Sequence, residues 1–317
     1  MNPFSSRAYA GSADLHRLIE FAQQTTGARW PGSTYMKAGD VVWMLFTPGF
    51  DPSENIRLWF DGDGLVAYAW FEPPLSVDFD IRPEPLPDDL LPDEILRWAE
   101  ERRRNLRRLD KETIPKAYAM LGENTISTKA LESDQQRIAF LLRNGYTRTD
   151  RFHVLYSRRL VEAPIAQPEL GAGLRLRHAT DADLDARVDV HRDAWSVWGN
   201  SKVTVETYRR LRSAPLYDPE LDVVLEDDAG KFLSYCIGWL DAANGIGHFE
   251  PVGCRPDSTG RGYARAVTLE GMRRMQARGL HTALVATESI NQRARVLYPS
   301  CGFVEVDRAH YYVKEPG

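Results

Sequence analysis

The sequence predicts an α/β protein with two domains that share one fold. The chain has 317 residues, whereas a single hydrophobic core seldom serves more than about 200. Strand-like and helix-like segments alternate along its second half, as they do in an α/β sandwich. Residues 134–146 also align without a gap on residues 291–303, at an offset of 157 residues. A repeat at half the chain length indicates two copies of one fold, although a helix, a glycine and an aromatic strand can recur by chance.

The first half begins with a helix and continues with strands. A helix is predicted over residues 12–25, with Ser12 as its N-cap and apolar side chains at helical spacing along one face. Runs rich in β-branched and aromatic residues predict four strands, at residues 41–47, 56–61, 65–71 and 75–82. The repeat unit at 134–146 then leads into a strand at 151–158.

A linker is predicted at residues 162–173, which contain prolines and glycines without a periodic pattern. It separates a domain of residues 1–161 from a domain of residues 174–317. In the second domain the predicted helices are 181–195, 205–213, 263–278 and one that starts near Asn291. The predicted strands are 174–178, 223–226, 232–241, 248–254, 282–287 and 304–314.

Composition excludes several classes of function. The net charge of −5 argues against a broad nucleic-acid surface. The three cysteines are dispersed without CxxC spacing, so neither a disulfide framework nor a metal site is expected. The sequence has no apolar run long enough for a signal peptide or a membrane span. We therefore expect a cytoplasmic protein, monomeric or homodimeric, that acts on a small molecule and has no membrane partner.

The most informative segment follows the strand at 248–254. Gly260 and Gly262 come just before the helix at 263–278, and Arg261 and Arg265 add positive charge. Closely spaced glycines leave backbone N–H groups uncovered, and the positive end of the helix dipole points at whatever lies in the loop. The segment predicts a cradle for a pyrophosphate. An isolated Gly-x-Gly pair more often makes only a tight turn, so the context decides.

Two motifs in order resemble the GCN5-related N-acetyltransferase (GNAT) family. The first, Q/R-x-x-G-x-G/A, is matched at Gly262 and Ala264, with Thr259 where the family usually has arginine or glutamine. The second, N-x-x-A-x-x-x-Y-x-x-x-G-F, is matched at Asn291, Ala294, Tyr298, Gly302 and Phe303. The resemblance covers about residues 174–314. It implies tandem GNAT-like domains, each with a mixed, mostly antiparallel central sheet flanked by helices.

The resemblance also implies acetyl-CoA as a co-substrate, with no metal. Its loop would bind the pyrophosphate, and Asn291 would contact the pantetheine arm. The residues expected to bind acetyl-CoA are Val252, Gly253, Cys254, Thr259, Gly260, Arg261, Gly262, Tyr263, Ala264, Arg265, Asn291 and Ala294. The first domain is expected to be degenerate and structural, because residues 83–94 carry four prolines, five carboxylates and no glycine where its loop would lie.

Amide formation from an amine and a thioester needs a base for the amine and an acid for the thiolate. His248 and Glu250 are two residues apart on a predicted strand, so both side chains lie on one face. We expect Glu250 to be the base, directly or through water, with His248 as the second candidate. By the resemblance, Tyr298 would protonate the thiolate. Each of the three also has a structural reading: a hydrogen-bonded carboxylate, a core histidine and a core tyrosine.

The acceptor is expected to be a primary amine of a small molecule, acetylated directly in a ternary complex. Trp195, Trp239 and Asp241 lie where the family binds its acceptors, and aromatics with a carboxylate would suit a cation. Tryptophans in such a fold are more often core residues. Two alternatives stay open: a mycothiol-synthase-like acetyltransferase, and a CoA-binding regulatory module that has lost turnover.

Overall fold

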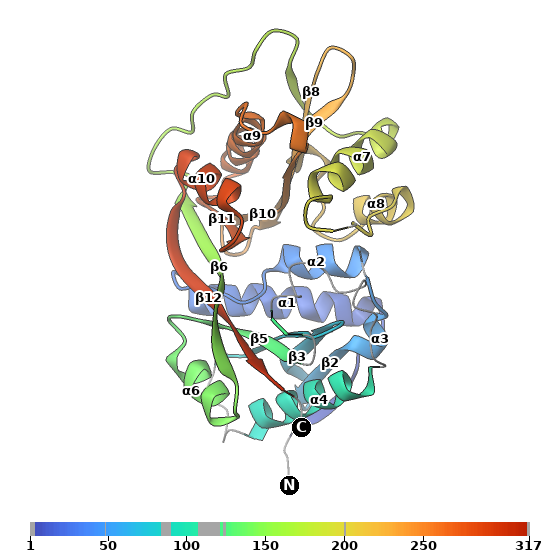
Figure 1. The fold of residues 1–317 in the computed structure, drawn as a ribbon, viewed down its shortest axis with the longest axis vertical. Coiled ribbons are helices and arrows are strands. Elements are labelled where there is room, and N and C mark those ends of the chain that lie inside the picture. Colours follow the sequence, from blue (N-terminus) through green and yellow to red (C-terminus); the bar gives the residue numbers. More distant parts are fainter. Residues whose placement is uncertain are drawn as a thin grey trace. The chain divides into compact units, whose positions relative to one another are not determined.

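A computed structural model describes residues 4–47, 49–83, 90–106, 121–122, 125–199 and 201–315 (Figure 1). The chain divides into two compact units. The N-terminal unit comprises Met1–Lys37, Pro48–His153 and Asp307–Gly317, and the C-terminal unit comprises Ala38–Thr47 and Val154–Val306. These units differ from the predicted boundaries, because the chain changes unit within two long strands and because residues 38–47 join the C-terminal unit.

The N-terminal unit is built on a mixed sheet in the order β1-β2-β3-β4-β5-β12-β6. Its described pairs are antiparallel except β4 with β5. Its strands are β1 Ser5–Ala8, β2 Ile56–Asp61, β3 Gly64–Glu72, β4 Ser76–Ile81, β5 Ile126–Leu131, β6 Thr147–Arg159 and β12 Val304–Lys314. Its helices are α1 Ser12–Arg29, α3 Pro52–Asn55, α4 Leu90–Asn105 and α6 Gln135–Arg143. The predicted first helix is confirmed, but Gly11 occupies its N-cap position in place of Ser12.

The C-terminal unit has the strand order β6-β11-β10-β9-β8-β7. Strands β7 to β10 pair antiparallel, and β10 pairs parallel with β11, so the expected mixed and mostly antiparallel sheet is confirmed. Its strands are β7 Arg175–His178, β8 Asp222–Glu226, β9 Phe232–Asp241, β10 Ile246–Cys254 and β11 Thr282–Glu288. Its helices are α2 Ala38–Phe46, α7 Leu184–Trp195, α8 Val205–Arg212, α9 Tyr263–Ala277 and α10 Gln292–Ser300, with short 3₁₀ turns at Asp181–Asp183, Pro219–Leu221 and Pro256–Ser258.

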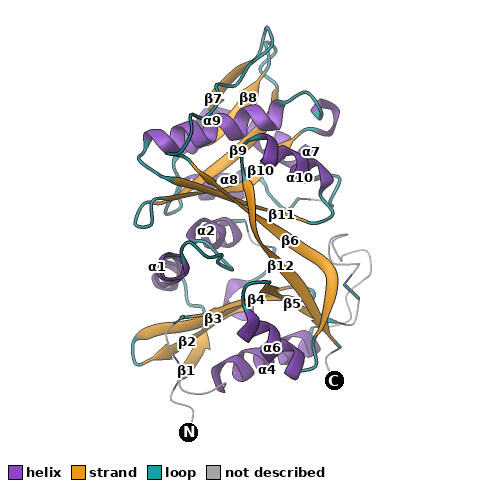
Figure 2. Cartoon of the chain, turned by 90° about the vertical axis from the view of Figure 1, so that its left-hand side faces the viewer, coloured by secondary structure: helices purple, strands orange, loops and turns teal. Residues whose placement is uncertain are grey.

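Helices cover both faces of this sheet (Figure 2). Helix α9 packs on strands β8, β9 and β10, where Gly247 and Gly271 allow Met275 and Phe249 to pack closely. Helices α7 and α2 pack on β9 and β10 from the other face. Because side chains alternate along a strand, His248 projects toward the face covered by α2 and α7, away from α9.

The segment predicted as a strand at residues 41–47 is instead helix α2, so that prediction was wrong. Val41, Val42 and the aromatic residues after them favour a strand by intrinsic preference. In the fold, Val41 and Val42 are buried, and Gly39 lies so close to Trp239 that a Cβ there would overlap the indole ring. Tertiary packing of one helix face against β9, β10 and α8 outweighs the local preference (Figure 1).

The internal repeat is confirmed at the level of geometry. Helices α6 and α10 have the same length, and the aligned residues Asp134 and Asn291 cap them. In each cap a side-chain oxygen accepts a hydrogen bond from the backbone N–H three residues on, at 2.9 Å in the first copy and 3.2 Å in the second. Gly145 and Gly302 follow these helices with φ of 80° and 83°, and long strands come next. The two halves therefore share one supersecondary unit.

Residues 84–89 of the acidic, proline-rich segment at 83–94 lie outside the described residues, which resume with α4 at Leu90. None of the helices that the structure describes is both long and apolar enough to span a membrane.

Candidate active site

The glycine loop has the geometry of an anion cradle. Gly260 and Gly262 have φ of 78° and 80°, a left-handed conformation that favours glycine. A Cβ at either residue would meet nothing within 4 Å, so both open onto free space. Gly262 is the N-cap of α9 and provides no side-chain cap for it. The N–H groups and the positive dipole end of a 15-residue helix therefore face this space.

The residues beside the two glycines differ in their hydrogen bonds and in their exposure. Thr259 donates its hydroxyl to the Pro256 carbonyl at 3.0 Å, so it is used within the loop. Arg265 donates to the carbonyl of Ser300 at 3.2 Å, which ties α9 to the end of α10. The other predicted loop residues surround the same opening: Arg261 is exposed, and Tyr263 and Ala264 are partly buried at the helix start. The structure thus brings the predicted loop residues together.

Strand β10 separates from its parallel neighbour beside this loop. The paired register with β11 ends at His248 and Leu284 among the described residues, although β10 continues to Cys254. The register with β9 also shifts between Phe249 and Val252, which places Glu250 in a bulge. Trp239 donates its indole N–H to the Glu250 carbonyl at 2.6 Å and holds the bulge in place. Strand β10 thus splits from β11 beyond His248.

The residues at the end of β10 are partly buried. Val252 and Cys254 flank Gly253, and burial raises the pKa of the Cys254 thiol. Gly253 has a packing role, because a Cβ there would overlap the ring of Tyr235. The absence of a side chain at Gly253 therefore serves the contact between β10 and β9.

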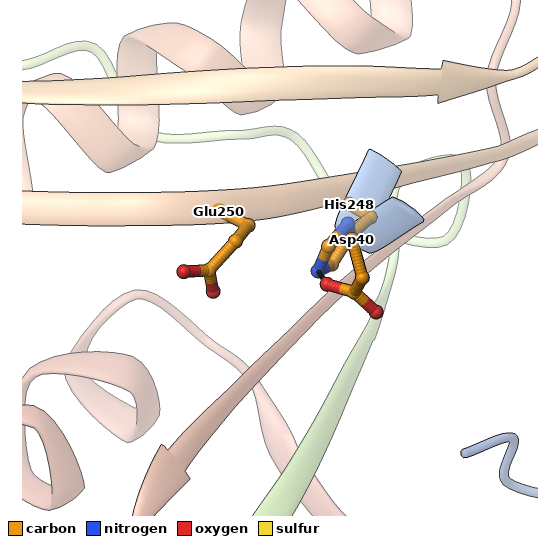
Figure 3. A group of neighbouring side chains, drawn as sticks. All are labelled: Asp40, His248 and Glu250. Carbon is orange, nitrogen blue, oxygen red and sulfur yellow. Dashed lines mark ion pairs between the residues drawn. The ribbon is translucent and has the colours of Figure 1, made fainter. Parts of the chain in front are cut away.

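Asp40, His248 and Glu250 form a cluster beside β10 (Figure 3). His248 is 5% exposed, and its Nε2 lies 3.1 Å from Asp40 Oδ1. One ligand atom from each of the three residues lies within 4.8 Å of the others. Among the described residues this is the one group of three or more histidine, cysteine or acidic side chains close enough to hold a metal ion.

Tyr298 is buried among aromatic side chains. It projects from α10, is 5% exposed, and packs against the rings of Tyr156 and Phe303 at centroid distances of 5.7 and 5.9 Å. Burial first, and the negative charge of Glu250 second, raise the pKa of Tyr298 far above its ordinary value. Its hydroxyl therefore keeps its proton at neutral pH.

Asn291 and Ala294 are used within the helix cap. The Asn291 side-chain oxygen accepts from the Ala294 N–H at 3.2 Å, so one of its two lone pairs is used in the cap of α10.

The three predicted acceptor residues differ in their burial and in their hydrogen bonds. Trp239 is 1% exposed and lies under Gly39. Trp195 donates its indole N–H to Tyr235 Oη at 2.8 Å. Asp241, at the end of β9, accepts from Asn244, and burial raises the pKa of its carboxyl. Trp239 supports the site from the core, and only Trp195 and Asp241 are partly exposed.

Sequence reasoning missed Asp40. It lies 208 positions before His248, in a segment whose pattern predicted a strand, and no motif connects the two residues. It also missed the pairing of Arg255 with Asp189 and Asp193, which ties the end of β10 to α7.

A buried histidine on α7 predicts a pH-dependent loss of stability. Burial first, and the positive charge of Arg187 second, lower the pKa of His191 from 6.5 to about 3. Between these values the unfolded chain binds the proton that the folded chain excludes. The free energy of unfolding should therefore fall as the pH drops below about 6.5, by up to about 1.4 kcal/mol per pH unit from this residue.

Urea denaturation at pH 7, 6, 5 and 4 checks this expectation. His191→Gln, which keeps polar atoms near Tyr235 and Ser201, should show a shallower loss than the wild type. His16→Gln, at an exposed site on α1, is the control and should follow the wild type. Equal slopes for His191→Gln and the wild type would contradict the assignment.

Comparison with known proteins identifies a family whose model matches part of the chain. A family model described as "Acetyltransferase (GNAT) family" matches residues 187–303, which include the glycine loop, β10 and Tyr298. The chain is 31% identical over 160 residues to a mycothiol acetyltransferase of Thermobispora bispora, covering 46% of this chain and 52% of that protein. It is 29% identical over 193 residues to a mycothiol acetyltransferase of Frankia casuarinae, covering 56% and 55%. The chain thus spans about half the length of these curated relatives.

Solved structures resemble the whole chain in fold. A GCN5-related N-acetyltransferase from Sphaerobacter thermophilus aligns with a TM-score of 0.67 at 20% identity, covering 100% of this chain and 96% of that one. A tandem GNAT protein from the clavulanic acid biosynthesis pathway aligns with a TM-score of 0.66 at 14% identity, covering 99% of each chain. These similarities establish the tandem architecture.

Proposed function

We propose that this chain, whose residues 187–303 match the model of the GNAT acetyltransferase family, transfers an acetyl group from acetyl-CoA to a primary amine of a small molecule. The observation that carries the proposal is the combination of an open glycine cradle, a split beside β10 and a buried tyrosine next to Glu250. An anion-binding helix start alone would serve many ligands. Together with a protonated acid and candidate bases, it fits thioester chemistry.

The loop residues fit the pyrophosphate of acetyl-CoA. A Cβ at Gly260 or Gly262 would fill the space that the phosphates need, and both positions lack one. The N–H groups at the start of α9 would hold the phosphates, and Arg261 would add positive charge at the rim. When bound, acetyl-CoA supplies an activated acetyl thioester.

Two proton transfers then fall to this chain. Glu250 or His248 takes a proton from the acceptor amine, which frees its electron pair to form the new C–N bond. Tyr298 donates its hydroxyl proton to the sulfur as the C–S bond breaks, so the leaving group departs as a neutral thiol. Direct transfer in a ternary complex requires no covalent bond to the enzyme.

We place this chemistry in the C-terminal unit and keep the N-terminal half as a structural domain. The first half carries Leu141 where the second carries Tyr298, and Leu141 is buried in its core. Its segment at residues 83–94 also lacks glycine. Neither the acid nor the cradle therefore has a counterpart there in sequence.

The names of the curated relatives favour mycothiol chemistry as a more specific acceptor class. Under this second candidate, the acceptor would be the amine precursor of mycothiol. The partly exposed Trp195 and Asp241 are the residues we would assign to it first.

Calorimetry and a turnover assay test the proposal. Acetyl-CoA is titrated into the purified protein, and release of free CoA thiol is then followed with a panel of amines that includes amino sugars, polyamines, amino acids and the mycothiol precursor. Binding near one equivalent with turnover of any amine is the expected result. Binding without turnover would favour the regulatory module, and absence of binding would overturn the assignment.

A further inference from the structure

Asp40 is a charged residue beside the proposed base that the acetyltransferase assignment does not use. We infer that Asp40 is a positioning residue, which fixes the ring of His248 so that His248 serves as the base. The inference rests on the proposed function and deepens it, because it chooses His248 over Glu250. The carboxylate comes from α2 and the imidazole from β10, and both elements belong to the C-terminal unit (Figure 3).

The contact determines the tautomer of the imidazole. His248 Nε2 lies 3.1 Å from Asp40 Oδ1, and two lone pairs at that distance would repel each other. The hydrogen therefore lies on Nε2 and is donated to Asp40, which leaves the lone pair of the neutral ring on Nδ1. Nδ1 is buried and has no hydrogen-bond partner among the described residues. A nitrogen acceptor without a partner, on an imidazole with a charged partner behind it, has the arrangement of an oriented general base.

The neighbourhood of His248 contains few groups that titrate. Asp40 comes from α2, and Glu250 lies on the same strand as His248. The residues paired with His248 are Trp239 on β9 and Leu284 on β11, and both are uncharged. Both neighbouring carboxylates carry the charge opposite to that of the imidazolium that a base becomes.

The step balances as follows. The acceptor amine donates its N–H proton to His248 Nδ1, directly or through one water, while its nitrogen forms the C–N bond with the acetyl carbon. The C–S bond breaks, and Tyr298 supplies the proton that the sulfur takes up. His248 leaves the step as an imidazolium paired with Asp40. Its extra proton then passes to solvent, and Tyr298 regains a proton from solvent, so both residues return to their starting states.

Kinetics with an acceptor from the panel test the pairing. Asp40→Asn keeps an oxygen that can accept from Nε2 but removes the charge, and we expect it to lower kcat by about tenfold to a hundredfold. Asp40→Glu should restore part of the rate. The KM for acetyl-CoA should stay within about twofold, since the cradle is untouched.

Two comparisons separate His248 from Glu250. His248→Gln should lower kcat at least as much as Asp40→Asn, and the double variant should be no slower than His248→Gln alone, because the two residues act as a unit. If Glu250 is the base, Glu250→Gln abolishes turnover, whereas Asp40→Asn leaves the rate at its wild-type value. That pattern overturns the inference while the proposed function stands.

The N-terminal unit offers a matched control. His310 is buried, its Nε2 lies 2.6 Å from Glu132 Oε1, and its Nδ1 also lacks a partner among the described residues. Glu132→Gln therefore makes the same chemical change at a histidine that the proposed step does not use, and it should leave kcat unchanged. All rates are measured again after EDTA treatment, because a bound metal would also connect Asp40, His248 and Glu250. Loss of the Asp40 effect under EDTA would contradict the positioning role.

Nuclear magnetic resonance tests the tautomer without any acceptor. Long-range ¹H–¹⁵N spectra of the seven histidines, with His248→Gln for assignment, should show His248 protonated on Nε2 at pH 7.5. A wild-type His248 protonated on Nδ1 overturns the inference. Failure of the proposed function differs from this outcome, because it appears as wild-type protein that does not bind acetyl-CoA.

Discussion

Replacing Gly262 with aspartate is expected to abolish acetyl-CoA binding. Gly262 has φ of 80°, and a side chain there would project into the free space of the cradle. A carboxylate at that position would lie next to the pyrophosphate. Two unit charges about 4 Å apart repel by about 4 kcal/mol near a protein surface, which corresponds to an affinity loss of at least a hundredfold. Calorimetric titration of acetyl-CoA measures the loss directly.

Gly279→Asp is a closely matched control for this variant. Gly279 follows the other end of α9, has φ of 80°, and has nothing within 4 Å of a Cβ. The same residue in the same backbone conformation thus lies away from the loop. Gly279→Asp should bind acetyl-CoA within about twofold of the wild type. Equal binding by Gly262→Asp and the wild type would show that the loop is not the phosphate site.

Tyr298→Phe is expected to lower kcat by roughly a hundredfold or more. Phenylalanine preserves the ring packing on Tyr156 and Phe303, so the change removes only the hydroxyl. Without that proton donor, the sulfur must depart as a thiolate in a buried environment. The KM for acetyl-CoA should change little, because Tyr298→Phe does not alter the glycine loop that is proposed to hold the phosphates. Steady-state kinetics with an acceptor from the panel give both constants.

Tyr156→Phe provides the control for Tyr298→Phe. Tyr156 is a buried tyrosine whose ring packs against Tyr298. Tyr156→Phe therefore also removes one hydroxyl from this cluster of rings. Its kcat should stay within about threefold of the wild type. A wild-type rate in Tyr298→Phe would remove the acid role and return Tyr298 to the core.

Local signals explain which parts of the fold the sequence could predict. The helix after the glycine loop was predicted at residues 263–278 and is found at Tyr263–Ala277, because a glycine N-cap and apolar residues at helical spacing agree. The strands at Phe232–Asp241 and Val304–Lys314 were predicted with the bounds that the structure has. In these segments local preference and tertiary packing favour the same structure.

Helix α2 shows where this agreement ends. Its run from Val41 to Phe46 favours a strand locally, but burial of one face against β9, β10 and α8 favours a helix. The close contact between Gly39 and Trp239 joins residues that are 200 positions apart. A contact of this kind produces no periodic pattern in the sequence. The position of Asp40 was unpredictable for the same reason.

The sequence by itself determined the α/β class, the repeat, the glycine loop and the candidate acid and bases, because each depends on short-range spacing that the backbone converts directly into geometry. Only the tertiary structure decided that Trp239 supports the bulge at Glu250, that the Asn291 oxygen caps α10, and that Asp40 meets His248. These contacts join distant segments, and their free energy comes from burial and from satisfied hydrogen bonds in the folded chain, which no local pattern encodes.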